Sequence, residues 1–175
     1  KAGKTFLKAL EAVPSSRSTS AAWSHELYRY SAYAYFAGWM GNYSESELYI
    51  QKAKHAWSIH EGQTYRELRW LKSEEGLILK TEGRLAQSRG EYKKAEQLFL
   101  KAIALAEEYD RLDDIAFYRR HLSEVLYFQG KMAEAEVHAR KALGEILEYG
   151  GSSYPSTAYF IYNLSLVLIS TGRTE

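Results

Sequence analysis

The chain has 175 residues, of which 46% are hydrophobic and 14% aromatic, so it can form a folded core and is not expected to be disordered. Its 23 basic and 22 acidic residues leave a net charge of +1, which gives no general attraction to nucleic acid or to an anionic membrane. No run of eighteen apolar residues could span a bilayer, and the lack of cysteine excludes disulfides, zinc–thiolate sites and a cysteine nucleophile. The lack of cysteine also fits a reducing compartment, and we expect a cytoplasmic location.

Apolar residues recur at three- and four-residue spacing along nearly the whole chain, which only Pro14 and Pro155 interrupt. This period predicts α-helix, and no segment shows the two-residue alternation of a strand. Ser44 with Glu47 and Thr64 with Glu67 fit capping boxes at the starts of the third and fourth helices. In chain order, we predict about eight helices, over residues 1–12, 21–40, 44–61, 65–89, 91–109, 113–129, 131–149 and 156–171.

Four glycines have related surroundings, and the spacings between them are 49, 40 and 42 residues. The seventh residue before each glycine is small and the fourth before it is apolar. After the first three glycines, the fifth residue is small, the ninth is apolar and the twelfth is alanine. Before Gly41, Gly90, Gly130 and Gly172, the seventh residues are Ala34, Gly83, Ser123 and Ser165, and the fourth residues are Ala37, Ala86, Leu126 and Leu168. After the first three glycines, the fifth residues are Ser46, Ala95 and Ala135, the ninth are Ile50, Phe99 and Ala139, and the twelfth are Ala53, Ala102 and Ala142.

These offsets have a structural reason, because steps of three and four place residues on one face of a helix. Small side chains on that face let two helices approach closely, while larger ones fill the adjoining groove. Glycine suits the point where the first helix ends and the chain reverses, since it adopts left-handed backbone freely. Each unit is therefore predicted to be a helix hairpin whose apolar face its neighbour covers, as in a solenoid.

The repeat resembles the tetratricopeptide repeat family over essentially the whole chain. The units are longer than the family's usual length of about 34 residues, and the proline that closes the second helix is absent. Units of this size are typical of the kinesin-light-chain-like branch, to which the segment SYPSTAYFIYNLSLVLISTGR is especially similar. The resemblance implies an all-α fold, a right-handed α-solenoid of antiparallel helix pairs. Residues 1–175 would form a single array in a fragment of a longer protein, divided into a trailing half-repeat 1–20, units 21–62, 63–111 and 112–151, and a leading half-repeat 152–175.

The first residues of the chain offer a competing interpretation, because Gly3-Lys4-Thr5 matches the end of a phosphate-binding loop. That loop would also need a further glycine and a strand upstream, and neither is present in the sequence. The segment Phe6–Leu10 instead matches Phe99–Ile103 of the second unit. We therefore interpret the opening as part of a truncated helix.

In the family that the chain resembles, the first helix of each unit lines a concave groove. Carried onto this sequence, the groove positions are strongly aromatic, with a basic centre at Lys80, Arg84 and Arg120. Aromatic side chains and arginine are the usual anchors of interfaces. We predict a non-catalytic scaffold that binds a peptide or partner protein with acidic and apolar side chains. The predicted binding residues are Tyr35, Trp39, Lys80, Arg84, Arg120, Glu124, Tyr127, Phe128, Tyr159, Tyr162 and Asn163; the same face includes Tyr28, Ser31, Gly38, Leu77, Gln87, Ser88, Phe117, Leu166, Ile169 and Ser170.

Two other functions stay open. In proteins that resemble this one, similar arrays form a regulatory or sensor arm of an ATPase, a transcription activator or a caspase-like protease. The basic stretch Arg66–Lys72 with its tryptophan raises single-stranded nucleic-acid binding, although the net charge argues against it. Open solenoid ends would expose apolar faces, so self-association is a further expectation.

Catalysis is not expected, because the sequence has no nucleophile elbow and no thiol. Neither His55 with His60 nor Glu134 with His138 supplies the convergent ligands that a metal site needs. We therefore expect no enzyme activity, no metal and no cofactor.

Overall fold

The computed structural model describes residues 21–60 and 68–173, with the surroundings of side chains given for residues 26–59 and 74–173. Across this part of the chain the structure has seven helices and no strand. The helices are α2 (Ala21–Trp39), α3 (Tyr43–His60), α4 (Leu68–Ser88), α5 (Tyr92–Glu108), α6 (Leu112–Phe128), α7 (Met132–Gly150) and α8 (Thr157–Ser170). Their bounds agree with the predicted ones to within one residue, except at the start of α4, which adjoins residues that are not described. The helix predicted at 1–12 also lies outside the described residues.

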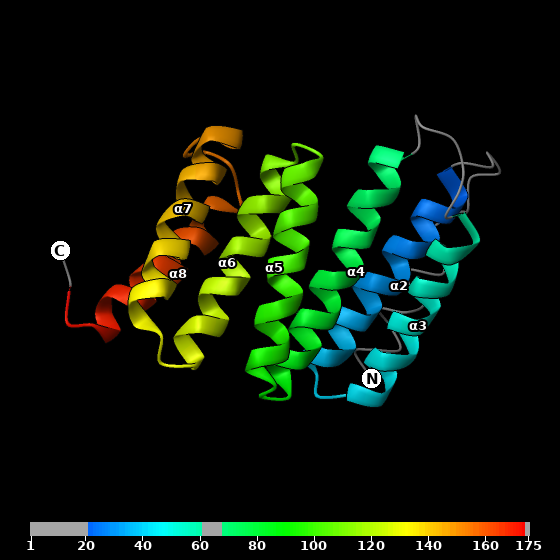
Figure 1. The fold of residues 1–175 in the computed structure, drawn as a ribbon, viewed down its shortest axis with the longest axis horizontal. Coiled ribbons are helices and arrows are strands. Elements are labelled where there is room, and N and C mark those ends of the chain that lie inside the picture. The colour runs from blue at the N-terminus through cyan, green and yellow to red at the C-terminus, as the bar shows by residue number, and fades with distance from the viewer. Residues whose placement is uncertain (1–20, 61–67, 174–175) are drawn as a thin grey trace.

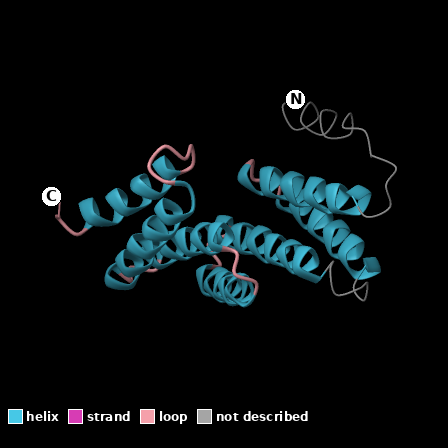
Figure 2. Cartoon of the chain, turned by 90° about the horizontal axis from the view of Figure 1, so that it is seen from above, coloured by secondary structure: helices cyan, strands magenta, loops and turns pink. Residues whose placement is uncertain are grey.

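The helices form two layers of a solenoid. The first helices α2, α4, α6 and α8 contact one another in that order, and the second helices α3, α5 and α7 each contact the first helices before and after them. Figure 1 shows the helices side by side in a row along the long axis, with α7 and α8 at one end and α2 and α3 at the other. Seen from above, the row bends, so that the two end groups lean toward the same side (Figure 2). The predicted all-helical solenoid is confirmed for the described residues.

The predicted glycines end the first helices in one repeated turn. Gly41, Gly90, Gly130 and Gly172 all have φ between 73° and 79°, which is left-handed backbone. At the turn after α2, the N–H of Gly41 donates to the Gly38 carbonyl at 3.1 Å and the N–H of Asn42 to the Ala37 carbonyl at 2.8 Å. The same two bonds recur at the other three glycines. This is a Schellman turn, which closes the helix and reverses the chain within two residues.

The short turn explains where the second helices begin and corrects the capping box predicted at Ser44. α3 starts at Tyr43, and the carbonyl of Asn42 accepts the first helical bond from Ser46 N at 2.9 Å. Ser44 therefore lies inside the first turn of the helix, so that prediction was wrong. The residue that directly follows the glycine holds the N-cap position of the second helix, as Glu91 does at α5 and Lys131 at α7. The capping box predicted at Thr64 lies outside the described residues.

The residues at the repeated positions around the turn glycines form the contact between the two helices of a hairpin. Residues at these positions in the first three units are buried, including Phe99, Ala102, Ala135 and Ala142 at 0% exposure. Two hydrogen bonds cross the same contact, from Ser46 Oγ to the Ala34 carbonyl at 2.7 Å and from Ser123 Oγ to the Ala135 carbonyl at 2.8 Å. Packing each second helix on this face leaves the opposite face of the first helix free for the surface described next.

Candidate binding groove

A hollow of about 520 Å³ lies on the surface of the first helices. All four of them contribute to it, because the hollow runs across the row from α2 through α4 and α6 to the start of α8. Five of the thirteen lining residues are tyrosine or phenylalanine, and each of the helices α2, α6 and α8 supplies at least one of them. The lining residues are Tyr28, Ser31, Ala32, Tyr35 and Phe36 from α2; Leu77, Lys80 and Thr81 from α4; Phe117, Arg120 and His121 from α6; and Ser156 and Tyr159 at α8.

Helical periodicity explains how these residues come together. Tyr28, Ser31 and Tyr35 are three and four residues apart and so follow one stripe of α2. Leu27 and Ala34 lie on the other side of α2, where they pack in the core. The corresponding stripes of α4, α6 and α8 align with that of α2 because the first helices stand next to one another. Most lining residues belong to the face that the sequence predicts, and the hollow is therefore built by the repeat itself.

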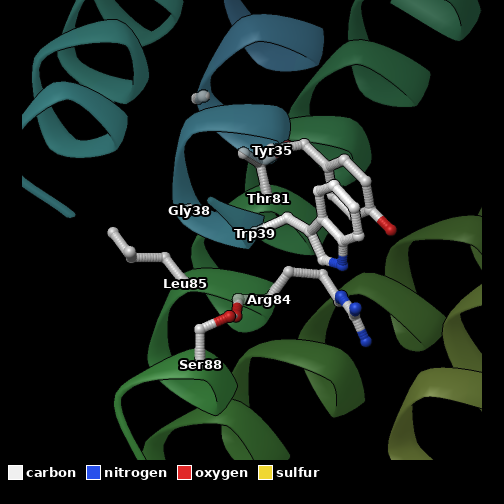
Figure 3. A pocket seen from close by; sticks show the side chains of 8 residues that line it. Tyr35, Gly38, Trp39, Thr81, Arg84, Leu85 and Ser88 are labelled. Carbon is white, nitrogen blue, oxygen red and sulfur yellow. The ribbon is translucent and has the colours of Figure 1, made fainter. Parts of the chain in front are cut away.

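A narrow crevice between α2 and α4 adjoins the hollow. It encloses only about 10 Å³, too little for a ligand group, and Tyr35, Trp39 and Arg84 are among the residues that line it. Figure 3 shows the side chains of these three residues extending in the same direction. The Arg84 guanidinium carbon lies 5.5 Å from the centre of the Tyr35 ring, a cation–π contact. Trp39 is 68% exposed, so its indole forms an open apolar rim beside the hollow.

An ion-paired cluster joins α4 and α6 beneath the hollow. Glu124 Oε2 lies 2.7 Å from Arg84 Nη1, and Glu124 Oε1 pairs with Arg120 Nη1. Burial alone would raise the pKa of Glu124, but the hydrogen bond with His121 and the two guanidinium charges together hold it well below its usual range. The predicted basic centre therefore contains its own carboxylate, which remains charged at neutral pH.

His121 completes this cluster and was missed by the sequence prediction. Its ring stacks on Phe99 with centroids 5.4 Å apart, and its Nδ1 lies 3.4 Å from Glu124 Oε2. Burial, followed by the Arg120 charge, lowers the pKa of His121 to about 3, so the ring is neutral at pH 7. His121 lies one residue after a predicted groove position and off the predicted stripe, so the spacing alone gave no reason to select it.

Lys80 differs from the two arginines because it has no hydrogen bond or ion pair within the described part of the chain. Its side chain is half-buried at the edge of the hollow. Burial lowers the pKa of Lys80, and the nearby charges of Arg120 and Arg84 act in the same direction, while Asp114 opposes them. Lys80 is therefore a cation that lines the hollow without a paired acidic group.

The remaining predicted binding residues lie further from the hollow. Phe128 is exposed and stacks on Tyr92 with ring centroids 5.6 Å apart, while Tyr127 packs partly against the core. Tyr162 is exposed on α8. These residues extend the aromatic surface, but they do not line the hollow.

Asn163 does not belong to this surface. It is only 2% exposed and, like Phe160 one turn earlier, it lies on the inward face of α8. Its selection followed the resemblance of the local sequence rather than the groove spacing. A buried side chain cannot contact a ligand at the surface, so the prediction of Asn163 as a contact residue was wrong.

The other sequence candidates gain no support from the geometry. The side chains of the basic stretch Arg66–Lys72 lie outside those that the structure describes. Among the described residues, no group of three or more potential metal ligands comes together. Nor does any helix within these bounds have the length and apolar character to cross a membrane.

The fold and the groove together define a class of protein, a solenoid of helix hairpins with a surface hollow that runs across its first helices. Residues 74–144, from α4 into α7, match the family model of the tetratricopeptide repeat. No curated protein sequence matches the chain. Proteins of this family generally mediate protein–protein interactions and are typically non-catalytic scaffolds.

Among solved structures, the chain is similar to BtubC (BKLC) from P. vanneervenii, a kinesin-light-chain-like tetratricopeptide repeat protein. The two are 14% identical in sequence and superpose with a TM-score of 0.73. The match covers 97% of this chain and 64% of BtubC. This similarity supports the helical repeat fold.

Proposed function

We propose that the chain is a non-catalytic interaction scaffold that binds a peptide segment of a partner protein in the hollow across its first helices. The observation that carries this proposal is the lining of the hollow, where aromatic side chains from separate helices surround a lysine that has no ion pair within the described part of the chain. Tyr28 and Tyr159 are largely exposed at opposite ends of it. Exposed aromatic rings in a concave surface bury a large area on binding with little loss of side-chain entropy.

The chemistry of the hollow selects acidic and apolar ligand side chains. The unpaired ammonium group of Lys80 attracts a carboxylate, while Tyr35 and Phe117 provide apolar contacts from the helices on either side. A ligand carboxylate at Lys80 would also offset the cost of burying that charge, because a buried cation is stabilised by a partner. The ligand is therefore expected to carry an acidic residue next to aromatic or aliphatic ones.

Selection from a phage library of random dodecapeptides tests this function, with the 175-residue chain as bait. We expect the recovered peptides to be enriched in Asp or Glu beside Leu, Phe or Trp. Lys80→Met should weaken binding of a recovered peptide at least tenfold in calorimetric titration, since it removes the charge and retains most of the apolar side chain. Lys101→Met makes the same change at an exposed position on α5 and should leave the affinity unchanged.

Two outcomes would contradict the proposal: a recovered pool without acidic residues, or peptides that bind Lys80→Met as tightly as the wild type. A regulatory or sensor arm of a larger protein, the alternative left open by the sequence, would use the same groove.

A further inference from the structure

We propose that Glu124 is a built-in counterion that lowers the affinity of the groove for acidic ligands, because a ligand carboxylate competes with it for Arg84 and Arg120. This inference rests on the proposed function, since it concerns the same hollow. It changes the role of Glu124 from a ligand contact to a residue that sets specificity. The groove would then bind ligands with few acidic groups and disfavour those that carry many.

The contacts place Glu124 between the two arginines. One carboxylate oxygen pairs with Arg84 on α4 and the other with Arg120 on α6, so a single side chain bridges adjacent first helices. The side chains are 21%, 20% and 14% exposed for Arg84, Glu124 and Arg120, respectively. Water screens such a partly buried cluster less than it screens an ion pair on the open surface.

The two guanidinium groups also contact aromatic rings. Arg84 lies over the ring of Tyr35, and Arg120 lies 5.9 Å from the centre of the Phe160 ring. Arg120 itself lines the hollow, and its Nε donor is buried without a partner. The arginines are therefore positioned to interact with a ligand, but Glu124 already accepts hydrogen bonds from both.

The charges nearby determine the direction of the effect. His121 is neutral at pH 7, so the cluster consists of the three cations Lys80, Arg84 and Arg120 against the single carboxylate of Glu124. Glu74 and Asp114 also lower the positive potential at Lys80. A carboxylate that enters the hollow is attracted by the cations and repelled by Glu124. Because opposite and like charges a few ångströms apart act strongly at partly buried sites, removing the Glu124 charge should strengthen binding of acidic ligands.

The test compares two synthetic probes, an acetylated and amidated tetrapeptide Phe-Glu-Leu-Phe and the same peptide with Gln in place of Glu. Their affinities are measured by calorimetric titration against the 175-residue chain at two salt concentrations. Glu124→Gln retains the shape and the hydrogen-bonding oxygen but removes the charge. We expect this variant to bind the Glu probe about tenfold more tightly than the wild type, with a steeper salt dependence, and to bind the Gln probe with unchanged affinity.

Glu145→Gln is the matched control. Glu145 also bridges to an arginine, with Oε1 2.9 Å from Arg119 Nε, and is similarly buried at 19% exposure, but it lies on the second helix α7, outside the cluster of Glu124 with Arg84 and Arg120. This variant changes the net charge of the chain by the same amount. It should bind both probes as the wild type does, so that only the charge between Arg84 and Arg120 affects the acidic probe.

A measurement on the unmodified chain covers the case in which Glu124→Gln does not fold. The side-chain Nε–Hε NMR signals of Arg84 and Arg120 should shift when the Glu probe is added and remain in place with the Gln probe. The inference is overturned if these signals do not respond to the Glu probe, if folded Glu124→Gln binds it no more tightly, or if the Gln probe gains equally. If the wild type binds the Glu probe but none of these effects is seen, the role proposed for Glu124 is refuted and the proposed function is not. If binding of the selected peptides does not depend on Lys80, the proposed function itself is refuted.

Discussion

Glu74 is buried on the inward face of α4, and its Oε2 has no hydrogen-bond partner. Burial, reinforced by the charge of Asp114, raises the pKa of Glu74 to about 7, while Arg111 and Lys80 act in the opposite direction. In the unfolded chain the pKa returns to its ordinary value near 4.5. Between these two values the folded protein binds more protons than the unfolded one. The contribution of Glu74 to stability is therefore fully present below its pKa in the unfolded chain and is lost as the pH rises through its pKa in the folded protein.

Glu74→Gln should remove this loss of stability. Relative to the wild type, the free energy of unfolding of the variant should rise by about 2 kcal/mol between pH 5.5 and pH 8, as measured by urea denaturation of both proteins at the two pH values. Buried His121 has a lowered pKa and so favours stability as the pH rises, but its effect is common to variant and wild type and cancels in the difference. Glu148→Gln, at an exposed position, is the control. A gain that does not change with pH would show that Glu74 is ionised equally in both states.

Individual residues were predictable only where a repeat position defined them. Lys80 and Arg120 occupy groove positions of the repeat and line the hollow, whereas Asn163 was selected from local similarity and is buried. The pairing of Glu124 with Arg84 joins residues 40 positions apart. No local pattern contains that contact, since the distance between α4 and α6 depends on how the hairpins stack.

At the scale of the helices, the contact between α4 and α5 depends on a glycine. A Cβ atom at Gly83 would lie 2.8 Å from Cζ and 2.9 Å from Cε1 of Phe99, which is fully buried. Gly144 also lies inside a helix, α7, but a Cβ there would have no neighbour within 4 Å. The first glycine therefore permits close packing of two helices, while the second only adds backbone freedom to the unfolded chain.

The two glycines should respond in opposite ways to the same substitution. Gly83→Ala should lower the free energy of unfolding by about 1–3 kcal/mol, because the added methyl group forces Phe99 and the two helices apart. Gly144→Ala should raise it by about 0.5–1 kcal/mol through its better helix propensity. Denaturant unfolding of both variants supplies the comparison. Equal stability of Gly83→Ala and the wild type would mean that α4 and α5 do not require this close approach.

The limits of the helices followed from the sequence almost everywhere. Apolar periodicity and the turn glycines placed them because both are local properties. The error at Ser44 arose from an unknown turn length: a serine followed by an acidic residue three positions later has the form of a cap, yet a two-residue Schellman turn gives the capping position to Asn42. Hydrogen bonds across the turn, rather than the serine motif, decide where α3 begins.

At the scale of the whole molecule, α8 presents an apolar face that the other first helices have covered. Leu126 of α6 is 2% exposed beneath α7, whereas Leu168, in the equivalent position of α8, is only half-buried. Ile161 and Ile169 of α8 are 51% and 64% exposed. Exposed apolar side chains on a terminal helix of a repeat array favour association.

We expect the 175-residue chain to self-associate through α8, so that its average mass in sedimentation equilibrium rises with protein concentration. The double variant Ile161→Asp and Ile169→Asp should remain monomeric, because association would bury two carboxylates. Leu100→Asp with Val137→Asp places the same charges at exposed positions on α5 and α7 and should associate like the wild type. A wild-type chain that stays monomeric at high concentration would rule out association through this face.

The sequence by itself determined the helical content, the glycine turns, the small residues between paired helices and the stripe that becomes the groove. All of these depend on neighbours within one hairpin or on helical periodicity, which spacing along the chain encodes directly. The tertiary structure alone decided which groove positions enclose the hollow, that Glu124 pairs with both arginines, and that Lys80 has no such partner. Those properties depend on the distance and orientation between successive hairpins, and they arise only when separate first helices pack beside one another.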